Sequence, residues 1–181
     1  MKRETIELGK IKFGKEVLVS DPCYDVGTWC TTNVGIKSGE YNSEIDVVNL
    51  GEWGDRIAAL RICHKDYPNT QPDTPIFDNV GVDSGQCGFW KPTAYAKIKA
   101  DEEKNDEFYN RVCNITLAER GAERGGVDKI GVISESGFGD GGYTAYAGYN
   151  LDGEIVSLEV EFITDAEAEE YLRYNDDDEI A

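Results

Sequence analysis

Short stretches rich in β-branched and aromatic residues recur along the chain, separated by Gly, Asn, Asp and Pro. This alternation of apolar runs and turn residues is typical of β-strands joined by short loops. It predicts strands at residues 5–8, 16–20, 33–37, 45–50, 56–64, 79–83, 127–135, 143–149 and 154–163. The predicted fold class is therefore mainly β (α+β), an antiparallel sheet or sandwich-like β domain with two short helices.

The clearest strand pattern lies near the end of the chain, at residues 158–162. Leu158, Val160 and Phe162 alternate there with Glu159 and Glu161. Because successive side chains of a strand point to opposite faces, the pattern predicts one core face and one face in water. A turn signal precedes it at residues 150–153, where Gly supplies a positive φ at low cost. We expect a hairpin of residues 143–149 with residues 154–163.

Two segments have the spacing and the termini of helices. Residues 101–119 place Phe108, Val112 and Ile115 at near-helical spacing after an acidic start, and Gly121 ends the pattern. Residues 165–172 follow Thr164, with Glu167 in the capping-box position. Residues 66–78 contain three prolines and predict a long loop. The predicted organisation is one β-rich domain, residues 1–174, and a flexible acidic tail, residues 175–181.

Charge and composition restrict the partners and the compartment. The chain has 181 residues, 36 acidic against 18 basic, and a net charge of −18. Direct binding to nucleic acid or to an anionic membrane is disfavoured, because phosphate groups are bound by basic surfaces. No apolar run reaches the roughly 20 residues of a membrane span, and the first residues lack a secretory signal. The expected location is the cytoplasm, or the host cytoplasm if a phage encodes the protein, with the five scattered cysteines reduced.

The acidic residues concentrate in the last third of the chain. Residues 131–181 contain fourteen acidic residues and one basic residue, Arg173. General solubility explains this bias as well as a binding surface does. The functional hypothesis is an acidic protein-binding module that mimics nucleic acid and occupies the basic groove of a nucleic-acid-processing partner, as an anti-CRISPR-like counter-defence inhibitor would. Its partner-binding residues are predicted to be Glu154, Glu159, Glu161, Glu167, Glu170, Tyr146, Tyr149 and Tyr171.

Three short boxes stand out from the strand pattern by their composition. They are Ser-Asp-Pro-Cys-Tyr at residues 20–24 (the first box), Val-Asp-Ser-Gly at residues 82–85 (the second box), and Ser-Gly-Phe-Gly-Asp-Gly-Gly-Tyr at residues 136–143 (the third box). With these boxes the sequence resembles the bacterial and phage proteins grouped as domain of unknown function 4241. The resemblance implies a mainly β fold in which the boxes meet, and it implies no activity.

The third box also satisfies the G-x-G-x-x-G pattern through Gly137, Gly139 and Gly142. That pattern cradles a pyrophosphate where a helix begins directly after it. Here a strand pattern follows, and Asp140 would place a negative charge in the cradle. We therefore expect a tight turn in which Asp140 accepts hydrogen bonds from backbone amides, and Asp21 is expected to do the same in the first box.

An enzyme is the alternative function, with a small-molecule, thiol or carboxylate site among the three boxes. A thiol site would use Cys23 or Cys87, and His64 is the single imidazole that could activate either thiol. A carboxylate site would pair acids of the boxes as an acid and a base, as in an enzyme that acts on a glycan, or would hold a divalent cation between them. The residues of this alternative site are Asp21, Cys23, Asp83, Ser84, Cys87 and Asp140. No cofactor and no metal site is predicted, because the cysteines and the single histidine lack ligand spacing.

Overall fold

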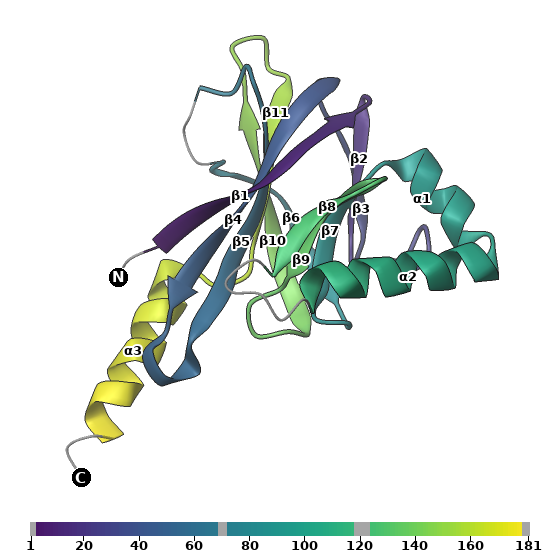
Figure 1. The fold of residues 1–181 in the computed structure, drawn as a ribbon. Helices are drawn as coiled ribbons and strands as arrows, with labels where there is room; N and C mark the ends of the chain where they lie inside the picture. Colours follow the sequence, from purple (N-terminus) through teal and green to yellow (C-terminus); the bar gives the residue numbers. More distant parts are fainter. Residues whose placement is uncertain (1–2, 69–71, 118–123, 179–181) are drawn as a thin grey trace.

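The computed structural model describes residues 3–68, 72–117 and 124–178, and these residues form two antiparallel sheets with helices at the outside (Figure 1). The six-stranded sheet has the order β1 (Arg3–Phe13), β4 (Gly39–Asn49), β5 (Asp55–His64), β11 (Ile155–Glu161), β10 (Gly141–Tyr149) and β6 (Thr74–Val82). The five-stranded sheet has the order β3 (Thr32–Gly35), β2 (Glu16–Ser20), β7 (Gln86–Trp90), β9 (Gly131–Glu135) and β8 (Gly125–Asp128). The mainly β, α+β prediction is confirmed.

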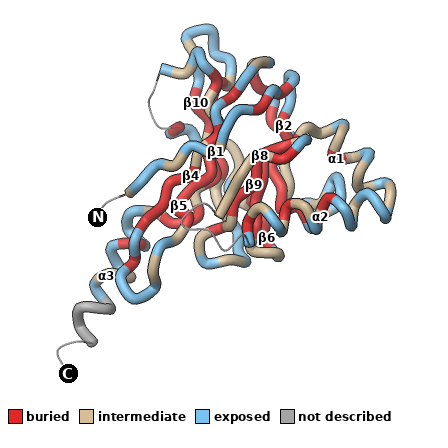
Figure 2. Tube along the Cα trace, viewed as in Figure 1, coloured by how far each residue is buried: buried red, intermediate tan, exposed pale blue. Residues whose placement is uncertain are grey.

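The main core lies between the two sheets. Val17 and Val19 of β2 and Phe89 of β7 face apolar residues of the six-stranded sheet, including Leu60 and Val160. Burial therefore follows the strands through the centre of the molecule (Figure 2). Because large apolar side chains from both sheets share one cluster, the sheets stabilise each other by removing apolar area from water.

The five-stranded sheet is also covered on its second face, by two helices. Leu18 and Ile133 point away from the main core and pack with Trp90, Tyr95 and Phe108. Tyr95 belongs to α1 (Pro92–Lys99) and Phe108 to α2 (Glu102–Thr116). This double coverage explains why β2, β7 and β9 are nearly continuous apolar runs without a polar face.

The predicted helices are present, and the structure adds one. Asp101 caps α2 by accepting a hydrogen bond from the Lys104 amide, and Phe108 and Val112 are buried as expected. The structure assigns no buried role to Leu117, whose side chain is 72% exposed. The helix α1 was not predicted, although Pro92 occupies its first turn, where a proline needs no amide hydrogen. Gly121, the predicted stop, lies outside the described residues.

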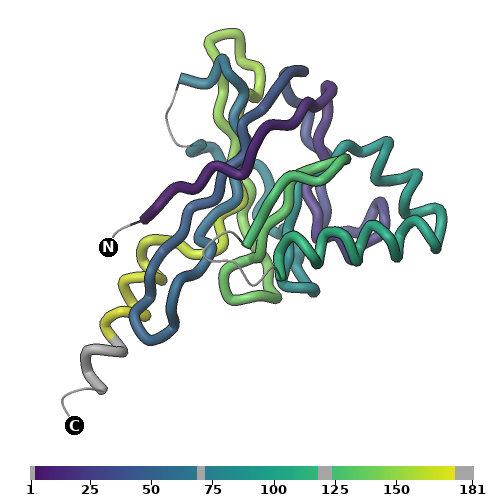
Figure 3. The backbone as a smooth tube through the Cα atoms, in the orientation of Figure 1, coloured from purple at the N-terminus to yellow at the C-terminus, as the bar shows by residue number. Residues whose placement is uncertain are grey.

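The last helix, α3 (Asp165–Asp178), is longer than the predicted residues 165–172 and continues into the segment expected as a tail. Its capping box is formed: the Thr164 amide donates to Glu167, and the Glu167 amide donates to the Thr164 hydroxyl at 3.2 Å. The turn between β10 and β11 and the helix α3 lie at opposite ends of the molecule (Figure 3). No helix in the described part of the chain combines the length and apolar character of a membrane span.

The strand predictions hold for the hairpin, miss β7 altogether, and differ from the structure in two further places. The strands β10 and β11 pair as predicted, with Asn150 Oδ1 accepting the amides of Asp152 and Glu154 in the turn. Residues 127–135 form two strands, because Lys129 and Ile130 make a turn between β8 and β9. The predicted loop at residues 66–78 ends earlier, since β6 starts at Thr74 and includes Pro75. That strand lies at the sheet edge, where a missing amide is tolerated.

Candidate functional site

The fully buried Asp21 carboxylate joins the first two boxes. It accepts the Cys23 amide at 2.7 Å within its own turn, as predicted. It also accepts the amides of Asp83 and Ser84, at 2.9 and 2.7 Å, and the Ser84 hydroxyl at 2.7 Å. A carboxylate that accepts several charge-assisted hydrogen bonds fixes the positions of its donors. Asp21 thus holds the second box against the end of β2.

The backbone around Asp21 is held from the five-stranded sheet and from α1. The Trp90 indole nitrogen donates to the Ser20 carbonyl at 2.9 Å. The Tyr95 hydroxyl reaches the carbonyls of Tyr24, at 2.6 Å, and Asp21, at 3.2 Å. Since Trp90 and Tyr95 are themselves fully buried, these bonds anchor the backbone of the first box to the helix-covered core.

The third box is a tight turn bound to the second box. The Ser136 amide donates to the Gly85 carbonyl at 3.1 Å, and the Tyr143 hydroxyl donates to the carbonyls of Ser136 and Gly139. Gly137 and Gly139 both have positive φ, which explains glycine at these two positions. The predicted turn is confirmed, but Ser136 and Tyr143 hold it. In the described structure Asp140 is exposed and its carboxylate makes no hydrogen bond, so its predicted role is wrong.

A cleft of about 530 Å³ opens where the second and third boxes meet α2. The second box contributes Ser84 and Gly85, and the next residue Gln86 follows them into the wall. Tyr109, Cys113 and Thr116 line it from α2, Glu135 lines it from the end of β9, and residues 136–139 line it from the third box. Trp53 and Phe138 form an aromatic rim, with 50% and 42% of their surfaces exposed. A concave site with convergent polar groups and exposed aromatic rings has the features of a ligand-binding site.

One cation and one carboxylate face this cleft. The Arg56 guanidinium lies 5.9 Å from the centre of the Phe138 ring, within the range of a cation–π contact. Glu135 is paired with Arg124 at 3.0 Å, and its partial burial raises the pKa of the carboxyl group. Inside the described structure, Arg56 forms no ion pair. Among the residues that the structure describes, the lining of the cleft therefore carries one positive and one negative charge within a strongly acidic protein.

The residues of the predicted thiol site are not activated. Burial and the neighbouring Asp21 carboxylate raise the pKa of Cys23 to about 12, and burial also raises the pKa of Cys87. His64 is buried on β5, 5.2 Å from the Tyr41 ring, and accepts the Asp66 amide. A thiol nucleophile needs a lowered pKa or an adjacent base. Neither feature is present at Cys23 or Cys87 in the described structure, so these contacts give no support to thiol catalysis.

The predicted carboxylates of the boxes take separate positions. Asp21 is internal, Asp83 is exposed and lies within hydrogen-bond range of the Tyr24 hydroxyl, and Asp140 is exposed in its turn. The boxes do meet, as expected, but they meet through Asp21, Ser84 and Gly85. No group of three potential metal ligands comes together among the residues that the structure describes.

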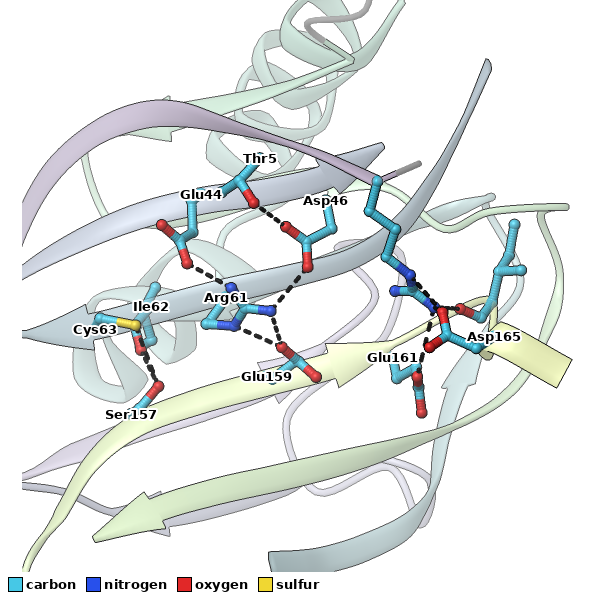
Figure 4. Close-up of polar contacts among 12 residues, drawn as sticks. Thr5, Glu44, Asp46, Arg61, Ile62, Cys63, Ser157, Glu159, Glu161 and Asp165 are labelled. Carbon is cyan, nitrogen blue, oxygen red and sulfur yellow. Dashed lines mark hydrogen bonds and ion pairs between the residues drawn. The ribbon is translucent and has the colours of Figure 1, made fainter. Parts of the chain in front are cut away.

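The expected exposed face of β11 is wrong for Glu159. This carboxylate is 8% exposed and binds the guanidinium of Arg61 on β5, together with Glu44 and Asp46 (Figure 4). Burial is the largest cause of the raised pKa of Glu159. Strand alternation indicated the correct side of the sheet. It could not show that Arg61 of the neighbouring strand β5 would lie against Glu159 and bury its carboxylate.

The other predicted partner-binding residues fall into separate regions. Glu161 is half-buried beside Arg3 and Tyr146, and Glu154 binds Lys37 at 2.6 Å near the exposed Tyr149. On α3, Glu167 belongs to the capping box, Glu170 is exposed, and the Tyr171 ring lies 4.5 Å from Phe138. Figure 1 shows the β10–β11 turn and α3 at opposite ends of the molecule. These eight residues therefore do not form one continuous face.

Sequence patterns gave no signal for several residues of the cleft. Trp53 lies in the single-turn 3₁₀ helix η1 (Gly51–Trp53), and Arg56 is the second residue of β5, so neither residue belongs to a box. Tyr109 and Cys113 are four residues apart on α2, which places them on one helix face. That spacing was visible in the sequence. The helix was predicted from its apolar residues, such as Phe108, which lie on a different face, and so the face of Tyr109 and Cys113 was not considered.

Comparison with known proteins gives a family and no closer relative. Neither the curated proteins nor the solved structures contain a significant match to this chain. The model of one family, described as a protein of unknown function (DUF4241), matches residues 14–160. This range includes all three boxes, Asp21 and every residue that lines the cleft. The chain therefore belongs to the DUF4241 family of proteins of unknown function.

Proposed function

We propose that this protein binds a small organic ligand in the cleft between the second box, the third box and α2. The observation that carries the proposal is that internal hydrogen bonds hold the second and third boxes beside the same cleft. Asp21 fixes Ser84, and the Gly85 carbonyl fixes Ser136, so that both boxes turn a face into one cleft. A binding site built on fixed elements loses little entropy when its ligand binds.

Binding is a better account of this site than catalysis. The Ser84 hydroxyl donates its proton to a carboxylate that is already bound to three amides, so both groups serve the fold. The other described groups of the cleft are amides, hydroxyls, aromatic rings, the Cys113 thiol, the Leu117 side chain and two opposite charges, Arg56 and Glu135, and no imidazole lies among them to activate the thiol. Such groups orient a ligand through hydrogen bonds and ring contacts.

A thermal-shift screen with a library of metabolites and fragments tests the proposal. A ligand that binds only the folded protein raises the melting temperature by mass action. We expect compounds that stabilise the original protein and fail to stabilise Cys113→Phe, whose added ring fills the cleft from α2. The matched control is Trp29→Ala, because Trp29 is 78% exposed outside the cleft. Stabilisation that persists in Cys113→Phe would place the ligand elsewhere and refute the proposal.

The acidic protein-binding module is a second candidate, supported by the charge of −18 and by the exposed Glu169 and Glu170 of α3. The aromatic group of Trp53, Phe138 and Tyr171 lies beside this helix. A basic partner, including the nucleic-acid-processing target of a counter-defence inhibitor, could contact both features.

Charge-neutralising variants on α3 test this second candidate. Glu169→Gln with Glu170→Gln should lower retention of a basic partner from bacterial lysate and weaken its salt dependence. Glu4→Gln with Glu7→Gln removes the same charge from exposed positions of β1 and is the control. Equal retention by all three proteins would contradict a role for α3.

A further inference from the structure

We propose that the cleft and a neighbouring pocket are two subsites of one groove that binds an uncharged oligosaccharide. This inference rests on the proposed function and adds the chemical class and the length of the ligand. The second pocket, about 400 Å³ in volume, is lined by Cys23, Lys99, Asn105, Asp106 and Asn110. Tyr109 lines both the cleft and this pocket. The two pockets are therefore neighbours, and the proposed ligand is longer than one ring and extends past Tyr109 from one to the other.

The charge of the lining indicates an uncharged ligand. The described residues that line the two sites include two cations, Arg56 and Lys99, and two carboxylates, Glu135 and Asp106. The surrounding protein carries a net charge of −18, which disfavours an anionic ligand. A strongly cationic ligand would face Arg56 and Lys99. Lys99 is already partly desolvated, since burial lowers its pKa and its ammonium donates to the Pro22 carbonyl at 2.7 Å.

The hydrogen-bonding groups of the lining suit a ligand with many hydroxyls. Asn105 and Asn110 each offer both a donor and an acceptor, and Tyr109 adds a hydroxyl group. Gln86 and Thr116 are buried in the wall and are bonded to each other at 2.9 Å. Asn105 Oδ1 is buried without a hydrogen-bond partner in the described structure. A buried acceptor without a donor costs free energy that a hydroxyl donor would recover. Sugar hydroxyls both donate and accept, so they match amide side chains better than a purely anionic or cationic group does.

The aromatic rim supplies the faces on which sugar rings can lie. Trp53 and Phe138 are half exposed at the mouth of the cleft, and Phe138 is supported from behind by Tyr171 at 4.5 Å. Trp53 also contacts both of these rings, at 6.2 Å and 6.0 Å between ring centres. An aromatic ring buries large apolar area while it stays in one orientation. The fixed rim can therefore cover the apolar face of a sugar while the amides bind its hydroxyl edge.

A neutral-glycan array, followed by calorimetry with the retained tetrasaccharide and its disaccharide, tests the inference. We expect the tetrasaccharide to bind the original protein and to lose more than tenfold in affinity with Trp53→Ala or Asn110→Ala. Each of these changes removes a group from a different subsite. The disaccharide fills one subsite, so its affinity should be lowered by only one of the two substitutions. Trp29→Ala should leave both affinities unchanged.

The outcomes separate the class of ligand from the existence of the site. If the array retains no neutral glycan while the thermal-shift screen still finds compounds that Cys113→Phe excludes, the oligosaccharide inference fails and the proposed function stands. If neither screen gives a compound that depends on the cleft, both fail. Tetrasaccharide affinity that changes in neither Trp53→Ala nor Asn110→Ala would overturn the two-subsite groove, even if the glycan binds elsewhere.

Discussion

The contacts of Asp21 are the residue-scale basis of the site, because one carboxylate positions donors more than 60 residues apart in sequence. The Asp-Pro dipeptide predicted its bond to the nearby Cys23 amide. Its bonds to the second box depend on the packing of β2 beside β7 and carry no local signal. In the same way, the lone His64 looked like a possible base, and only the fold shows that Tyr41 covers it.

Asp21→Ala should lower the free energy of unfolding by about 3 kcal/mol, because it leaves buried amide donors without acceptors. Asp140→Ala should change it by less than about 0.5 kcal/mol, as at an ordinary surface position. Urea denaturation followed by circular dichroism measures both changes. Similar effects of the two substitutions would contradict the role assigned to Asp21.

The reactivity of Cys23 tests its chemical state. Because the pKa of Cys23 is raised to about 12, its thiol stays protonated at pH 7.5. Alkylation by iodoacetamide should therefore be at least tenfold slower than for a free cysteine peptide, although Cys23 is exposed. Peptide-resolved mass spectrometry measures this rate for each cysteine. Alkylation of Cys23 faster than that of the free peptide would contradict the raised pKa and support the alternative of a thiol enzyme.

The charged cluster around Arg61 shows how neighbouring elements change a strand. Alternation along β11 predicted the facing direction of Glu159, but cross-strand pairing with β5 determined its burial. The same limit explains why α1 and β7 were missed. Both segments are short. Their conformation depends on the packing of their own residues, Trp90 of β7 and Tyr95 of α1, in the helix-covered core. Longer periodic elements such as α2, and turns with explicit residues such as Asn150 and Gly153, were predictable.

Arg61→Met should destabilise the protein by about 3–5 kcal/mol at pH 7, because three carboxylates lose the cation that neutralises them. Adding Glu159→Gln should restore part of that stability by removing one of the uncompensated charges. Guanidinium denaturation of the single and double variants measures this coupling. Additive losses in the double variant would show that Arg61 and Glu159 do not interact.

The partly buried carboxylates also predict how stability depends on pH. Burial raises the pKa of Glu135, Glu159 and Glu161, so the folded state binds more protons than the unfolded state above pH 4.5. Stability should therefore fall as pH rises from 4.5 through the raised pKa values, and the melting temperature should be higher at pH 5.5 than at pH 7.5.

Two matched variants separate this effect from general charge repulsion. Glu161→Gln should flatten the change of melting temperature between pH 5.5 and 7.5, because it removes one of the shifted groups. Glu170→Gln removes the same charge from an exposed position and should leave the slope nearly unchanged. Melting curves of the three proteins measure the slopes. A steeper slope in Glu161→Gln would contradict the burial of that carboxyl group as its cause.

At the scale of the whole molecule, the acidic residues of the last third of the chain and the residues that line the cleft are largely different sets. Net charge restricts what can approach the surface, and the structure shows that several acids of the last third are used in ion pairs and caps. The three boxes, in contrast, were recognisable in the sequence and meet in space. The cleft between the second and third boxes was not predictable, because Trp53, Arg56 and the Tyr109 face of α2 complete it from distant parts of the chain.

A crystallographic fragment screen of the full chain tests the central claim most directly, because it locates bound molecules of any chemical class on the protein surface. We predict that fragments with rings and hydroxyl or amide groups will concentrate in the cleft, in contact with Trp53, Phe138 or Gln86. The neighbouring pocket at Asn105 and Asn110 should be the next most populated position. Fragments that leave the cleft empty and gather at other surfaces would contradict the proposal that this cleft is the binding site.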